Sequence, residues 1–90
     1  MTTKAELTCE LRDLEDEYRF WLVEAISIER GIDDMEKQID TYEQELGPER
    51  VADFRARLVR TRERHQAIEE KILYVRARLV ELRERLEQIP

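Results

Sequence analysis

The sequence predicts an all-α protein in which two long helices fold back on each other as an antiparallel coiled-coil hairpin. Charged residues make up 42% of the 90 residues, against roughly 25% in an average globular protein, and only two glycines and two prolines are present. Apolar residues recur in alternating steps of three and four through both halves of the chain, the pattern of a left-handed coiled coil. One Gly-Pro pair, Gly47-Pro48, separates the halves. We therefore treat residues 1–90 as a single helical domain.

The first helix is expected over about residues 4–46. Its apolar seam contains no polar residue and consists of Leu7, Leu11, Leu14, Tyr18, Trp21, Ala25, Ile28, Ile32, Met35, Ile39, Tyr42 and Leu46. With the heptad positions lettered a to g, Leu7 takes position d and Leu11 position a. Gly31 costs about 1 kcal/mol relative to alanine inside a helix and could divide the segment, giving three helices. The heptad phase continues through Gly31, so we predict one helix.

The turn is expected at residues 47–49. Gly47 suits the left-handed conformation that often ends a helix, and Pro48 suits the first turn of the next one. Glu49 is favourable beside the positive end of that helix.

The second helix is expected over about residues 49–89. Its seam starts with Val51 at position a and consists of Val51, Phe54, Leu58, Thr61, His65, Ile68, Ile72, Val75, Leu79, Leu82, Leu86 and Ile89. Thr61 and His65 are its only polar members. A weak or polar layer is therefore expected midway along this helix.

The charges beside the seam indicate which helices pair. The e and g positions of the first helix carry glutamates and neither lysine nor arginine, whereas those of the second carry arginine and lysine, with Glu69 the sole acid. An acidic flank repels its own copy and attracts a basic one, so the two halves of one chain should pair, antiparallel across the tight turn. The register stays open, because at least two pairings satisfy the layering of a against d.

Eight large apolar residues lie outside the seam and form the predicted interface: Phe20, Leu22, Val23, Ile26, Val59, Leu73, Tyr74 and Val80. In an antiparallel pair Leu22, Ile26, Leu73 and Val80 should share one side of the hairpin, and Phe20 and Tyr74 the other. An exposed apolar patch usually marks an interface. Two hairpins could bury the patch as a homodimeric four-helix bundle, and a different protein partner is the alternative.

The sequence predicts no catalytic, cofactor-binding or metal-binding residue. One histidine and one cysteine do not make a zinc site, and the acidic clusters lack the glycine turn of a calcium loop. His65 is interpreted either as a pH-sensitive or register-setting polar layer or as a partly solvated residue in a weak layer. Cys9, at an outward position, is expected to be a surface thiol. A two-helix hairpin offers no concave pocket, so we do not expect an enzyme.

These features predict a protein–protein interaction module: a small adaptor, a scaffold, or a chaperone-like coiled-coil protein. The alternative is a nucleic-acid-associated regulator that uses Arg60 and neighbouring arginines of the second helix, although the net charge of −6 argues against it. No apolar run follows a basic start, and no segment reaches the ~18 apolar residues that span a bilayer. With a single cysteine, the chain is expected to be cytoplasmic and to make no membrane contact.

Overall fold

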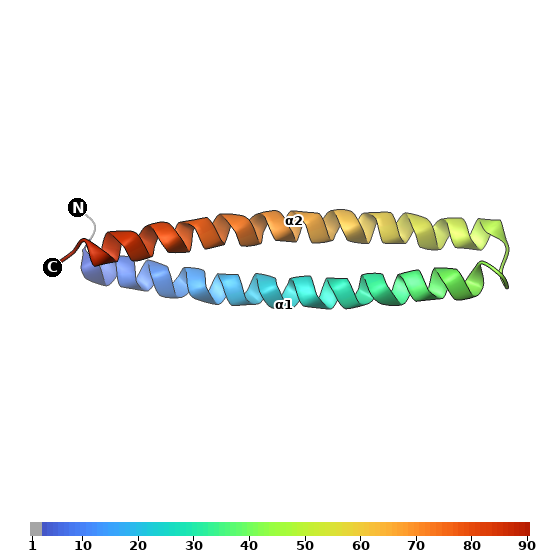
Figure 1. Ribbon diagram of the computed structural model, residues 1–90, viewed down its shortest axis with the longest axis horizontal. Coiled ribbons are helices and arrows are strands. Elements are labelled where there is room, and N and C mark those ends of the chain that lie inside the picture. Colours follow the sequence, from blue (N-terminus) through green and yellow to red (C-terminus); the bar gives the residue numbers. More distant parts are fainter. Residues whose placement is uncertain (1–2) are drawn as a thin grey trace.

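The structure, a computed structural model, describes residues 3–90 and contains two helices, α1 (Lys4–Tyr42) and α2 (Pro48–Glu87). They lie side by side and antiparallel, so that the start of α1 and the end of α2 lie at the same end of the molecule, opposite the turn (Figure 1). The Cα atoms extend over 67 × 15 × 14 Å. The predicted all-α hairpin is confirmed, and within residues 3–90 the buried apolar side chains all lie in the seam between the helices.

α1 begins at a side-chain cap and ends earlier than predicted. The Oγ1 atom of Thr3 accepts a hydrogen bond from the backbone N–H of Glu6 at 3.2 Å, which satisfies one of the free donors of the first turn. The helix ends at Tyr42, before the predicted end near residue 46. Both Glu45 and Leu46 donate backbone hydrogen bonds to the Tyr42 carbonyl, at 3.0 and 2.8 Å, and thereby tighten the chain into a turn.

α1 runs through Gly31 without a break, as predicted. No atom beyond its own helix backbone and chain neighbours lies within 4 Å of the place that a Cβ would take at Gly31. This glycine therefore does not serve a close helix–helix approach within the hairpin.

Gly47 adopts a positive φ, but not the left-handed helical conformation expected for it. Its φ is 77° and its ψ is 168°. A following proline disfavours helical ψ values and drives the preceding residue toward extended ones, which explains the difference. The resulting combination of a positive φ with an extended ψ is accessible essentially to glycine alone.

The core consists of seam residues. The buried apolar side chains all belong to the predicted seam: Leu7, Ala25, Ile39, Val51, Leu58, Ile68, Val75, Leu79 and Leu82. Leu82 and Val75 are the most deeply buried, at 0% and 1% exposed. Near the turn the rings of Tyr42 and Phe54 stack with their centroids 5.7 Å apart. One continuous seam thus joins the helices from the turn to the chain ends.

Cross-helix ion pairs fix the register that the sequence leaves open. Glutamates of α1 meet arginines of α2 in four pairs, e with e and g with g: Glu43–Arg55, Glu36–Arg62, Glu15–Arg83 and Glu10–Arg78. Pairing of equal letters is the arrangement expected of an antiparallel coiled coil. Exposed pairs of this kind each contribute about 0.2–1 kcal/mol, so their main effect is to select the partner helix and its alignment.

Candidate interaction surface

The large apolar side chains that remain exposed are the eight residues of the predicted interface. Their exposed fractions run from 37% at Leu22 to 72% at Tyr74, for Phe20, Leu22, Val23, Ile26, Val59, Leu73, Tyr74 and Val80. Their exposure within the hairpin agrees with the sequence analysis. Their role as an interface stays a prediction.

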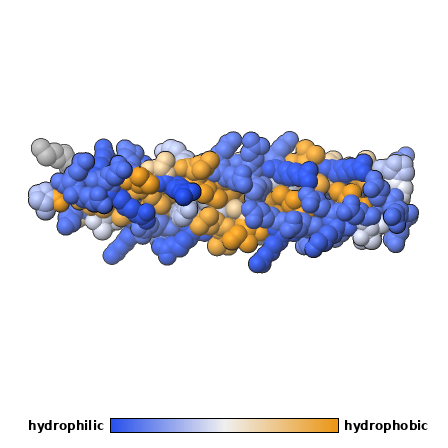
Figure 2. Space-filling view, in the orientation of Figure 1, coloured by the Kyte–Doolittle hydropathy of each residue, from blue (hydrophilic) through white to orange (hydrophobic). Residues whose placement is uncertain are grey.

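Five of the eight lie along one side of the hairpin. Leu22, Ile26 and Leu73 line a shallow groove midway between the turn and the chain ends. Val59 lines a second groove nearer the turn, and Val80 a third nearer the chain ends. We call the side that carries these five residues the groove side. Figure 2 shows one broad hydrophobic patch near the middle of the hairpin and further patches toward both ends, surrounded by hydrophilic surface.

The ion pairs that border the groove side are interrupted at its centre. Near the turn Glu36 pairs with Arg62, and near the chain ends Glu15 pairs with Arg83 across 3.5 Å. Between these pairs, Leu22 takes an e position where the other seam-flanking residues of this row are mostly glutamates, and Glu69 takes one where α2 otherwise has arginine. The cross-helix pairing of glutamate with arginine is therefore missing where the central groove lies.

His65 bridges two glutamates at the edge of that groove. Its Nε2 atom lies 3.0 Å from Oε1 of Glu29 on α1, and its Nδ1 atom lies 3.5 Å from Oε1 of Glu69 on α2. The His65 side chain is 17% exposed. Both glutamates also line the central groove beside Leu22 and Ile26. The geometry favours the interpretation of His65 as a polar layer that ties the two helices together.

The sequence indicates no further metal ligand beside His65, whereas the structure brings Glu29 and Glu69 close to it. The ligand-capable atoms of the three residues lie within 4.8 Å of one another. Imidazole and carboxylate groups can both bind zinc. Each ring nitrogen faces a different carboxylate, however, so one ion could take only one of the two nitrogens. Glu69 could have been found from its i, i+4 spacing to His65, but the approach of Glu29 depends on the register.

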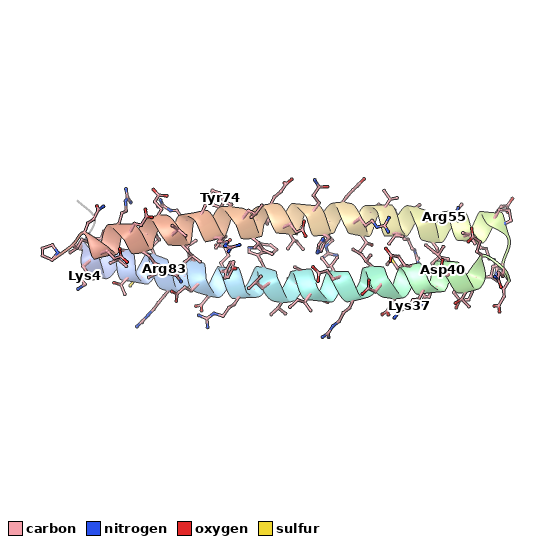
Figure 3. The ribbon with its side chains drawn as sticks, viewed as in Figure 1. Lys4, Lys37, Asp40, Arg55, Tyr74 and Arg83 are labelled. Atoms are coloured by element: carbon pink, nitrogen blue, oxygen red, sulfur yellow. The ribbon has the colours of Figure 1, made fainter. Side chains whose placement is uncertain are left out.

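The opposite side of the hairpin is covered mainly by charges. The Nζ atom of Lys71 lies 4.3 Å from the centroid of the Trp21 ring, and the indole N–H donates to Glu17 across 3.3 Å. Phe20 packs edge-on against Trp21, with the ring centroids 5.0 Å apart. Tyr74 projects from α2 away from α1 (Figure 3). Phe20 and Tyr74, the two residues predicted to share this side, therefore do not form a continuous apolar surface.

Arg78 is the most heavily paired cation on this side. It donates to Glu10 of α1 at 2.9 Å and pairs with Glu81 of its own helix at 3.1 Å. Hydrogen bonds to Glu10 and then to Glu81 raise the pKa of the guanidinium above its ordinary value. The two carboxylates thus stabilise the charged form of Arg78.

Two predicted features lie apart from both sides. Val23 faces outward on α1, beside Ile26 and Gly31 in a shallow hollow on the surface of that helix. Cys9 is exposed, as expected of a surface thiol.

Within residues 3–90, neither helix has a stretch that is apolar enough to cross a membrane. Comparison of the chain with protein-family models, curated proteins and solved structures finds no match.

Proposed function

We propose that this chain is a protein–protein interaction module, an adaptor or scaffold that works by docking its groove side and not by catalysis. The observation that carries the proposal is the alignment of five exposed apolar residues on one side of a hairpin whose core, over the described residues, is a single seam: Leu22, Ile26, Val59, Leu73 and Val80. Burying a large apolar side chain contributes roughly 1.5–3 kcal/mol relative to full exposure. A partner that covers this side is the natural source of that stabilisation.

The partner that we propose is a second hairpin, which would complete a four-helix bundle. A chain of 90 residues buries a smaller share of its surface than a larger domain does, and oligomerisation is a common remedy. Closed two-fold dimers are the commonest assemblies of identical chains. An amphipathic helix of another protein is the competing occupant of the same grooves.

Nucleic-acid binding is the alternative function, and the structure gives it limited support. Arg50, Arg57 and Arg60 surround a shallow hollow beside Phe54, and no ion pair within the described residues 3–90 involves these three arginines. Four other arginines of α2 face glutamates of α1. A native gel with duplex DNA and RNA at low salt tests this alternative: we expect unchanged mobility, and a salt-sensitive shift would favour it.

The proposed function is tested by light scattering coupled to size exclusion. We expect wild type to elute with twice the 10.9 kDa mass of the chain, and Leu22→Glu/Leu73→Glu to elute with the mass of one chain. Val23→Glu is the matched control, since Val23 is 66% exposed but lies off the groove side, and it should stay dimeric. Far-UV circular dichroism of each variant establishes that the hairpin is folded. A wild-type monomer at all concentrations would contradict the proposal of self-association.

A further inference from the structure

We infer that the second copy docks antiparallel to the first, about a two-fold axis that passes close to Ile26 and Gln66, so that the two turns lie at opposite ends of the bundle. This inference rests on the proposed function and specifies how the groove side would meet itself. Two rows of residues, one on each helix, carry it.

The row at the b positions of α1 is self-complementary in charge. It contains Arg12, Arg19, Ile26, Asp33 and Asp40 at seven-residue spacing. Arg19, Ile26 and Asp40 each line one of the three grooves, which places the row on the groove side. Its charge changes sign at Ile26. A second copy, related to the first by a two-fold axis at Ile26, therefore places its own Ile26 opposite Ile26. The same rotation places Arg19 opposite Asp33 and Arg12 opposite Asp40 of the other copy.

These charges are available for a partner. Within residues 3–90, no ion pair involves Arg12, Asp33 or Asp40. Arg19 forms an ion pair only with its neighbour Asp16, at 3.4 Å and with both side chains mostly exposed, and its Nε atom donates to the Glu15 carbonyl at 3.4 Å. This contrasts with the e row beside it, where glutamates and arginines already pair within the hairpin. Figure 3 shows Asp40 toward the turn and Arg83 toward the chain ends, at the two ends of this side.

The row at the b positions of α2 is self-complementary in shape. It contains Ala52, Val59, Gln66, Leu73 and Val80, again at seven-residue spacing. A two-fold axis at Gln66 places Gln66 of one copy opposite Gln66 of the other. It also places Val59 opposite Leu73 and Ala52 opposite Val80. Every exposed valine and leucine of the row thereby meets an apolar side chain. The arrangement also gives Val59, which is remote from the central groove, an apolar counterpart.

One axis satisfies both rows. Ile26 is one helical turn from Glu29, and Gln66 adjoins His65, so the contact of Glu29 with His65 places Ile26 and Gln66 at nearly the same height. Both residues also lie near the middle of their helices. Two hairpins related by this axis overlap along almost their whole length, which maximises the area they bury.

The other two-fold arrangement, with both turns at the same end, places α1 of one copy against α2 of the other. In the register of this hairpin, that arrangement sets Arg19 opposite Leu73 and Asp33 opposite Val59. Charged groups would then be buried without counter-charges, which is strongly unfavourable. The charge pattern thus selects the antiparallel dimer.

Paired charge reversals test the orientation. Arg12→Glu/Arg19→Glu makes the α1 row wholly acidic apart from Ile26, and Asp33→Arg/Asp40→Arg makes it wholly basic. We expect each double variant alone to dimerise roughly a hundredfold more weakly than wild type, and an equimolar mixture to form a heterodimer detectable by native mass spectrometry. The quadruple variant, whose pattern is again antisymmetric, should dimerise as wild type does. Double variants that self-associate like wild type would overturn the orientation and leave the proposed function standing, whereas a monomeric wild type would overturn both.

A disulfide test gives an independent measurement that does not require a change of charge. In a Cys9→Ser background, Ile26→Cys and Gln66→Cys each bring two thiols together at the axis, and we expect mild oxidation to give covalent dimers. Ser27→Cys, one residue away at position c and off the groove side, should stay largely uncrosslinked. Equal crosslinking of Ile26→Cys and Ser27→Cys would contradict the proposed axis.

Discussion

His65 and Glu29, from different helices, approach with the Nε2 atom 3.0 Å from Oε1 of the carboxylate. Glu69 reaches the other ring nitrogen at 3.5 Å, so two acids of the e rows converge on one half-buried imidazole. Elsewhere on the groove side, Glu36 meets Arg62 in the same kind of position. The contact therefore marks the place where the regular pairing of glutamate with arginine stops.

Glu69→Arg should restore that pairing. An arginine at this position can reach Glu29 as Arg62 reaches Glu36, and we expect the free energy of unfolding to rise by up to about 1 kcal/mol. Urea unfolding followed by far-UV circular dichroism measures the change. Glu70→Arg, at the outward f position, is the control for the altered net charge and should have an effect of no more than about 0.5 kcal/mol. A loss of stability specific to Glu69→Arg would contradict the register.

Gly31→Ala should stabilise the hairpin by about 1 kcal/mol, because alanine replaces the poorest ordinary helix former in an unbroken helix, and its Cβ meets no atom within 4 Å beyond its own helix backbone and chain neighbours. Thermal unfolding followed by circular dichroism is a sufficient measurement. Destabilisation would indicate that another molecule approaches the backbone closely at this glycine, since nothing within the hairpin does.

Gly47→Ala should destabilise the hairpin by about 1–3 kcal/mol, because a Cβ is strained at a φ of 77° with an extended ψ. The same unfolding measurement applies, with Glu45→Ala in the neighbouring turn as a control that keeps the glycine. An unchanged stability would show that the turn relaxes to a conformation open to other residues.

Leu82→Ala should lower the free energy of unfolding by about 2–5 kcal/mol, because Leu82 is 0% exposed in the seam and its truncation leaves a cavity. Leu73→Ala is the informative comparison, since Leu73 is 62% exposed in the hairpin. Urea unfolding at two protein concentrations separates the roles of the two residues. A Leu82→Ala variant as stable as wild type would contradict the pairing of the halves along this seam.

The seam, the turn and the pairing of the two halves could be predicted from the sequence, because each depends on local periodicity or on the charge of whole rows. The register could not, because it requires knowing how residues such as Glu10 and Arg78 line up across the hairpin. The contact of His65 with Glu29 was missed for the same reason. The ψ of Gly47 departs from expectation because the following proline overrides the usual helix-ending geometry.

More of the candidate surface than of the register could be predicted from the sequence. The exposure of Leu22, Ile26 and Leu73 follows from their positions outside the seam. Their convergence on one groove follows from the antiparallel arrangement. Val23 and Tyr74, which the same reasoning included, lie off the groove side. Heptad positions already separate Tyr74 from the other side of the hairpin, and the three-dimensional arrangement adds Val59 to the aligned row.

X-ray scattering coupled to size exclusion tests the central claim, that two hairpins cover each other's groove sides over their full length, most directly. We expect wild type to give a particle of twice the 10.9 kDa chain mass whose longest dimension stays close to the 67 Å length of one hairpin, apart from side chains. A particle of one chain mass at every concentration, or a dimer substantially longer than one hairpin, would contradict the claim.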